Sequence, residues 1–449
     1  MPTLTLNVGL RYERPPSLTE KYGRWSNFLP DMGVQVTAQP YNSLLYAEQL
    51  GLPQSLMYPS TRGLTPRVGL SWHPDNNLRV GASWGMFLSE PSSNAIRQDL
   101  AEVMPFVTIW PSTRNKADPT ILTLDDPFPV GGIDKPSIAG FDLHPPRPYL
   151  LSWSFSLQDR LINGRTLELQ YTGSKGTHLG RRYDLNQAPL DASMVNPDTG
   201  SIPRPYPCCK TINYYSFGSN SSYNALLAAF TRKLGDKSSL RLNYTYSKSL
   251  DDASLSYGAG AGGYAGAQDR RNLGLEKGRS DWDARHAAKV TYDLQSPWKK
   301  NPYLRGWAFS GVGTAASGLP FTPQVLKPDT GKGEASRPDR IARDQAPNPS
   351  PTLWYDPSAF PVIPAGSYRP GTSGRNVLDG PGLISLDLSL RRALSVSEGK
   401  RFEFRADAYN ALNRANLGMP AIYVNAPNVG TIVSAKPGRA FQFSAKFAF

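Results

Sequence analysis

Carboxylate and imidazole side chains lie close together in the segment SDWDARH, as Asp281, Asp283 and His286. Residues of these types can act as general acids and bases in catalysis. A structural interpretation, in which the segment marks the entry to a strand, is nevertheless favoured. The other histidines lack the spacing of metal ligands and are interpreted as turn or strand-end residues. They are His73, His144 and His178.

Two further motifs suggest chemistry but lack its context. Gly258, Gly260 and Gly263 match G-x-G-x-x-G, yet a nucleotide fingerprint needs a preceding strand and a following helix, so a flexible loop is predicted. The adjacent Cys208 and Cys209 could form a vicinal disulfide or a metal pair, but two free or loosely oxidised thiols are favoured. No nucleophile elbow or paired-carboxylate arrangement stands out. The sequence therefore predicts no catalytic, cofactor-binding or metal-binding residues, and no enzyme.

The charge of the chain gives little information about partners. Its 449 residues carry 49 basic and 36 acidic side chains, a formal net charge of +13. The basic residues are dispersed and do not form the runs typical of nucleic-acid-binding tails, so no nucleic-acid partner is predicted. No apolar stretch of about 18 residues occurs, which argues against a transmembrane helix.

The elements that must position any functional residue are strands. Apolar and polar residues alternate with period 2 in about twelve segments, which predicts strands with one apolar and one polar face. In SLRLNYTYSKS, for example, Leu242 belongs to the apolar face and Asn243 to the polar face. The segments are 4–12, 67–72, 77–86, 149–158, 166–171, 224–233, 239–249, 287–295, 306–317, 384–392, 401–410 and 439–449.

The connections between these segments alternate between short and long. This pattern is typical of outer-membrane β-barrels, which have short periplasmic turns and long extracellular loops. A strand of ten residues tilted by about 45° spans roughly 23 Å, close to the apolar band of such barrels. A soluble β-sandwich shows similar alternation along its strands, but its loops need not alternate in length. Aromatic residues expected at the membrane interfaces are Trp72, Trp84, Tyr171, Tyr246, Tyr292 and Trp298.

The long connections are the predicted site of ligand binding. Segments 89–148, 174–221 and 317–380 contain aromatic residues that are expected to be exposed: Trp110, Tyr214, Tyr215 and Trp354. In a receptor such residues form an outer ligand vestibule. Packing of loops over the barrel mouth is an equally weighted alternative.

Five stretches carry a family resemblance through their order and spacing. They are SSYNALLAAFTRKLGDKSSLRLNYTYSKSLDD, GRSDWDARHAAKVTYDL, GWAFSGVGTAASGLPFTP, FRADAYNALNRANLG and FQFSAKFAF. Together they resemble the β-barrel of TonB-dependent outer-membrane receptors, specifically the Oar-like group. The resemblance implies a barrel of about 22 strands with an N-terminal plug. It also implies import of a bound substrate with energy passed on by TonB.

The resemblance predicts an all-β fold, an antiparallel transmembrane barrel of the bacterial outer membrane with about 12 strands present. The chain shows no signal peptide, TonB-contact segment or plug. Residues 1–449 are therefore expected to be the C-terminal part of one receptor barrel domain, linked to the TonB system only through a missing plug. The terminal alternation of Phe441, Phe443, Phe447 and Phe449 resembles the signal read by the barrel assembly machinery.

The expected partners are outer-membrane lipid, the assembly machinery and an extracellular substrate, with siderophore, glycan and peptide all open. Two alternatives remain. One is a complete, smaller outer-membrane barrel that acts as a passive pore or a barrel enzyme. The other is a secreted soluble β protein that binds a ligand.

Overall fold

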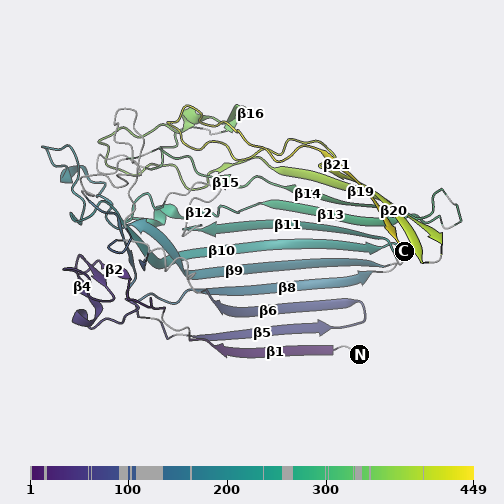
Figure 1. Ribbon diagram of the computed structural model, residues 1–449, viewed down its shortest axis with the longest axis horizontal. Coiled ribbons are helices and arrows are strands. Elements are labelled where there is room, and N and C mark those ends of the chain that lie inside the picture. The colour runs from purple at the N-terminus through teal and green to yellow at the C-terminus, as the bar shows by residue number, and fades with distance from the viewer. Residues whose placement is uncertain are drawn as a thin grey trace.

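The computed structural model contains one large antiparallel sheet whose long connections gather at one end (Figure 1). Both termini lie at the opposite end, beside the short connections. The structure describes residues 3–14, 18–58, 60–61, 63–89, 100–101, 104–107, 135–161, 164–235, 237–254, 266–298, 300–301, 303–326, 328, 336–342, 345–397 and 399–449.

All twelve predicted strands are confirmed, and each pairs with its neighbour in the chain to form a meander. The strand order is β1-β5-β6-β8-β9-β10-β11-β13-β14-β19-β20-β21. The bounds are β1 Thr3–Tyr12, β5 Leu64–His73, β6 Leu78–Leu88, β8 Tyr149–Leu161, β9 Arg165–Asp184, β10 Ile212–Lys233, β11 Ser239–Asp251, β13 His286–Gln295, β14 Trp307–Ala316, β19 Leu383–Ser397, β20 Lys400–Tyr409 and β21 Ala440–Ala448.

The register gives the sheet two chemically different faces. Leu242 of β11 pairs with Phe230 of β10 on one side and with Val290 of β13 on the other. Because side chains at paired positions share a face, this row is apolar across the sheet. On the opposite face Asn243 pairs with Lys289. The predicted facing of Leu242 and Asn243 is therefore confirmed as two opposite faces of one sheet.

The sheet is open in the structure. Among the described residues, β1 pairs only with β5, and β21 pairs only with β20. Every residue of these two edge strands is exposed. Figure 1 shows β1 as the lowest ribbon of the sheet. Each edge thus presents backbone groups that no described strand satisfies.

Two strands extend well beyond the others at the end with the long connections. β9 has 20 residues and β10 has 22, and bulges interrupt their pairing between Ser216 and Ser221. β7 (Ile138–Phe141) adds to the extended part of β10 in parallel. A small sheet packs over this extension, comprising β2 (Ser26–Leu29), β3 (Val34–Thr37) and β4 (Leu45–Tyr46), followed by η1 (Ala47–Leu50). We call residues 18–58, β7 and the extensions of β9 and β10 the first loop module.

The later connections build a second core. We call it the second loop module and define it as the described residues within 266–285, 319–379 and 410–439. Its short elements are η3 (Leu273–Glu276), β12 (Gly278–Arg279), β15 (Pro320–Phe321), β16 (Gln345–Ser350), β17 (Leu353–Tyr355), η5 (Pro357–Ala359) and β18 (Leu378–Asp379). Phe321, Tyr355 and Phe360 are buried together at its centre. Another short helix, η2 (Ala192–Met194), lies between β9 and β10. No helix among the described residues is long and apolar enough to span a membrane.

Candidate functional site

Tyr214 and Tyr215 are not exposed loop residues, so this part of the sequence prediction is wrong. Both belong to the extension of β10 and are buried, with 7% and 4% of their surface accessible. The ring of Tyr215 stacks on Phe141 of β7 at 4.8 Å. Sequence alone suggested a loop because the small sheet that covers β10 comes from residues far earlier in the chain. A vestibule role for these tyrosines is not tested and stays a prediction.

A partly buried carboxylate lies beside these aromatic rings. Asp142 follows β7 directly and accepts a hydrogen bond from the Phe217 amide at 3.0 Å. The Tyr214 hydroxyl donates a second hydrogen bond to it. Burial nevertheless raises the pKa of Asp142, because the charged form loses water that these two donors only partly replace. Asp142 thus links β7 to β10 through these two hydrogen bonds.

Trp354, the other predicted vestibule residue that the structure describes, is half-buried in β17. Its indole N–H donates to the Asp379 carbonyl at 2.8 Å, and the ring packs against the core of the second loop module. Trp110 lies outside the described residues. The exposed aromatic side chains that the described connections do present include Tyr22 and Trp282, neither of which the sequence analysis selected.

The SDWDARH segment belongs to a buried ionic network. Arg375 of the second loop module reaches the end of β11, where its guanidinium pairs with Asp251 and donates to Ser254 Oγ at 2.7 Å. It also lies 3.6 Å from the carboxylate of Asp281. Asn376 donates to the same carboxylate at 2.7 Å. The network therefore joins the end of β11 to a connection more than a hundred residues later.

The second carboxylate of the motif has separate partners. Asp283 accepts from the Ser249 amide at 2.7 Å, from Arg279 at 2.8 Å and from Arg285 at 3.2 Å. His286 points away from both carboxylates, since its Nδ1 lies 2.7 Å from the Tyr244 hydroxyl on the apolar face. The three residues do not form an acid–base site, in agreement with the structural interpretation.

A chain of buried amide and carboxylate groups extends the network. Glu276 accepts from the Gln268 amide at 2.9 Å and from Arg337 at 2.6 Å. The Gln268 side chain donates to the Gly371 carbonyl and accepts from the Arg337 amide. The backbone carbonyl of Gln268 accepts from the Gln187 side chain. These contacts fasten the connection after β9 to the second loop module. The sequence analysis missed them because each links residues remote in the chain.

The polar face of the sheet carries a recess of about 530 Å³ between β11 and β20. Arg405 and Asp407 lie in it as an ion pair at 2.8 Å, beside Asp293, Asp387 and Tyr409. Such a lining suits hydrated, polar solutes better than lipid. The polar face of segment 401–410 is therefore the face that would line a lumen.

Other sequence-based expectations have mixed outcomes. Cys208 and Cys209 are joined in a vicinal disulfide, so the preference for free or loosely oxidised thiols is wrong. Adjacent cysteines rarely bond because their geometry is restrictive, which is why sequence reasoning favoured thiols. The glycine motif lies outside the described residues. Within the described residues, no group of three or more His, Cys, Asp or Glu side chains could hold a metal ion.

The apolar face has aromatic residues near both ends. Trp72 and Tyr292 lie toward the short connections, and Trp84 and Tyr246 lie toward the long ones. Trp298 belongs to the short connection after β13, and Tyr171, which pairs with Phe155, lies near the middle of the sheet. A glycine accommodates one further ring: the Trp153 indole lies 2.5 Å from the position that a Cβ on Gly173 would occupy. Two aromatic belts on an apolar face are typical of a barrel that spans a membrane.

The terminal strand has the predicted alternation. Phe441, Phe443 and Phe447 share the apolar face of β21, and Phe449 follows it. All four rings are more than half exposed. Their role as an assembly signal is not tested and stays a prediction.

An antiparallel meander with one apolar and one polar face, aromatic belts and long connections at one end defines a β-barrel protein of the bacterial outer membrane. The sequence model of the family described as "Outer membrane beta barrel domain" matches residues 1–442, and the chain belongs to this family. It is accordingly located in the outer membrane. No curated protein matches the chain in sequence.

Several solved structures are similar to the chain at low identity. The outer membrane transporter YddB of Escherichia coli has a TM-score of 0.49 and 11% identity, over 88% of this chain and 41% of that one. The ferripyoverdine receptor of Pseudomonas aeruginosa has a TM-score of 0.43 and 11% identity, over 87% and 34%. The siderophore receptor PiuA of Acinetobacter baumannii has a TM-score of 0.42 and 9% identity, over 86% and 36%. The chain thus spans less than half the length of these structures.

Proposed function

We propose that the chain is part of the barrel of a TonB-dependent receptor of the Oar-like group, which takes up a substrate bound at the cell surface. The observation that carries this proposal is the pair of packed loop modules at the end with the long connections. A passive pore needs only a lumen, whereas a receptor needs an ordered outer surface to bind its substrate. The five stretches that resemble Oar-like receptors support the same function.

The open edges support the proposal that further strands complete the barrel. Backbone groups at an unpaired edge cannot be satisfied in hydrocarbon, so β1 and β21 each need a neighbour in the membrane. In a receptor the remaining strands of the barrel supply those neighbours, and the plug that contacts TonB fills the lumen. The terminal phenylalanines then serve as the assembly signal.

A second candidate is a complete barrel of twelve strands that acts as a passive pore. It is favoured by the opposite directions of β1 and β21, which allow these two edges to pair with each other in an antiparallel manner. The two candidates differ in whether these strands are neighbours, and this difference can be measured.

Cross-linking distinguishes the two candidates. A Val8→Cys/Phe443→Cys variant, made in a chain whose two native cysteines are replaced by serine, is treated with a short bismaleimide in outer membranes. The receptor proposal expects no intramolecular cross-link, because other strands separate β1 from β21. Leu6→Cys/Leu70→Cys is the positive control, since these residues face each other across β1 and β5.

An efficient Val8–Phe443 cross-link in a heat-modifiable, protease-resistant barrel would overturn the receptor proposal in favour of the pore. If the Leu6–Leu70 control cross-links and the Val8–Phe443 pair does not, the result supports additional strands between β1 and β21. Uptake of candidate siderophores, glycans and peptides by the complete receptor, with and without a functional TonB, then tests transport directly.

A further inference from the structure

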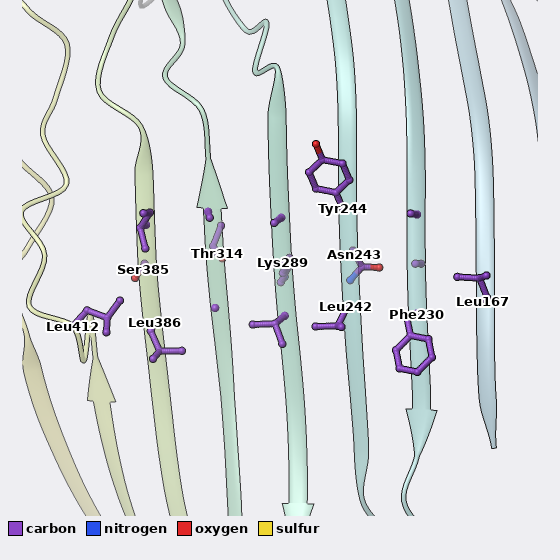
Figure 2. Close-up of a pocket in the computed structure, with 17 residues that line it drawn as sticks. Leu167, Phe230, Leu242, Asn243, Tyr244, Lys289, Thr314, Ser385, Leu386 and Leu412 are labelled. Atoms are coloured by element: carbon purple, nitrogen blue, oxygen red, sulfur yellow. The ribbon is translucent and has the colours of Figure 1, made fainter. Parts of the chain in front are cut away.

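A groove of about 520 Å³ crosses the apolar face of the sheet (Figure 2). Its floor consists of small residues on neighbouring strands, Ala288 of β13 with Gly313 and Ala315 of β14. Leu242 and Tyr244 of β11 rise on one side, and Leu386 of β19 rises on the other, as Figure 2 shows. The groove exists because a glycine and two alanines stand where the flanking strands carry larger side chains.

The register determines the direction of the groove. Ala228, Tyr244, Ala288, Ala315 and Ile384 form one continuous row of paired residues. Five strands at a spacing of about 4.8 Å make this row roughly 19 Å long. Strands of such barrels tilt by about 35–45°, so a row perpendicular to them is inclined to the membrane normal and does not lie in the membrane plane. Half of a hydrocarbon core is about 15 Å thick, so the groove has the length of one acyl chain.

One end of the groove reaches the side of the membrane with the long connections. Leu412, just beyond β20, lines the groove, and the adjacent Ala411 donates its amide to the Leu386 carbonyl at 2.7 Å. Long connections of bacterial barrels face the outside of the cell. The groove therefore opens toward the outer leaflet.

Two arginines flank this opening. Arg414 is exposed two residues after Leu412, and the Arg439 guanidinium lies 3.4 Å from the Ala411 carbonyl. Neither arginine pairs with a carboxylate among the described residues. The Arg439 guanidinium also lies 5.6 Å from the centre of the Phe441 ring, which holds it at the outer surface of β21. Guanidinium groups bind phosphate oxygens in a bidentate geometry, so the opening complements a phosphate group.

We propose that this groove is a binding site for a phosphorylated lipid of the outer leaflet. One acyl chain lies over Ala288, Gly313 and Ala315, and the phosphate is held by Arg414 and Arg439. The apolar groove alone would accept any hydrocarbon, but the cationic opening selects an anionic headgroup. The site is on the outside of the barrel and does not depend on the proposed transport function.

Photo-labelling in vesicles tests the site. The full chain is isolated from outer membranes and reconstituted with phosphatidic acid that carries a diazirine near the end of one acyl chain. Diacylglycerol with the same labelled chain, which has no phosphate, is the headgroup control. Adducts are mapped by mass spectrometry, and they are expected to be concentrated on β11, β13, β14 and β19 for phosphatidic acid only.

Matched variants separate the two parts of the site. Ala288→Leu fills the groove, whereas Ala82→Leu places the same side chain on the apolar face of β6, away from it. Each methylene excluded from the groove lowers lipid affinity about fourfold. Arg414→Gln and Arg439→Gln are each expected to weaken labelling by phosphatidic acid about tenfold. Arg305→Gln, an exposed arginine in the connection between β13 and β14 at the other end of the sheet, should have no effect.

Heat-modifiable migration confirms that each variant is folded before it is compared. If Ala288→Leu does not fold, the labelling map of the unmodified chain still decides the question. Adducts spread evenly over the apolar face, or equal labelling by phosphatidic acid and diacylglycerol, would overturn the proposal.

Discussion

Replacing Arg375 by alanine should destabilise the second loop module strongly. The Arg375 side chain is fully buried, and it donates to Ser254 Oγ at 2.7 Å and to the Glu276 carbonyl at 2.9 Å. It is also the cationic partner of Asp251 and lies 3.6 Å from Asp281. Both carboxylates are 4% exposed, so they would remain buried without compensation.

The expected cost is about 3–5 kcal/mol, the usual effect of removing one partner from a buried ion pair. Two secondary contacts limit the loss. Ser254 still donates to Asp251, and Asn376 still donates to Asp281. The lost free energy should therefore weaken the contact between residues 336–379 and β11. The hydrogen bonds between the strands of the sheet should not change, because they do not involve Arg375. Local opening of this connection should precede loss of the sheet.

Limited proteolysis of the protein in detergent measures this effect. Cleavage within 345–379 should be at least about a hundredfold faster in Arg375→Ala, since 1.4 kcal/mol corresponds to a factor of ten. Arg369→Ala is the matched control. Arg369 also pairs with an aspartate, Asp339, but its side chain is 46% exposed, and exposed pairs contribute little. Equal cleavage of the two variants would refute the claim that the buried network holds the module in place.

Other predictions concern the two faces, the first loop module and the terminus. Leu242→Arg should reduce the yield of folding into lipid vesicles, because an arginine near the midplane costs about 2–4 kcal/mol. Asn243→Arg should reduce the yield only slightly, because Asn243 is on the polar face. Folding yields in the reverse order would contradict the assigned faces. Because burial raises the pKa of Asp142, the first loop module should be most stable below the unfolded pKa and should lose stability as the pH rises through the folded pKa. Proteolysis between pH 4 and pH 7 should show this trend, and Asp142→Asn should remove it. Deleting Phe449, which is 95% exposed, should lower the outer-membrane level of the protein in cells and leave its melting temperature in detergent unchanged; a normal cellular level would argue against a role in assembly.

The strands could be predicted because their pattern is local. Each segment shows the alternation with period 2 in its own sequence, because one face of a barrel strand contacts lipid and the other faces the lumen. The extensions of β9 and β10 could not be predicted in this way. Beyond Tyr171 the β9 sequence GSKGTHLGRRYD loses its alternation. It remains extended because it pairs with β10 and because its Tyr183 packs against a core shared with β2 and β7.

The candidate site was less predictable than the strands because it depends on contacts between remote residues. Arg375 and Asp251 are 124 positions apart, and nothing near either residue indicates the other. The sequence predicts an exposed loop position for Tyr215, whereas its ring stacks on that of Phe141 in the structure. Exposure in the loops of a barrel is a property of the assembled modules, so an aromatic residue between two predicted strands does not by itself indicate a ligand site.

The directions of the two edge strands impose a parity rule on any closure of the sheet. β1 runs away from the short connections and β21 runs toward them, and each step between neighbours reverses direction. Strands placed between these edges can keep both junctions antiparallel only if their number is even, with zero included. An odd number would force one parallel junction, which breaks the meander. A co-expressed segment that completes the barrel should therefore work in sets of two, four or more strands, and a segment trimmed by one strand should fail even though it covers nearly the same width of the gap.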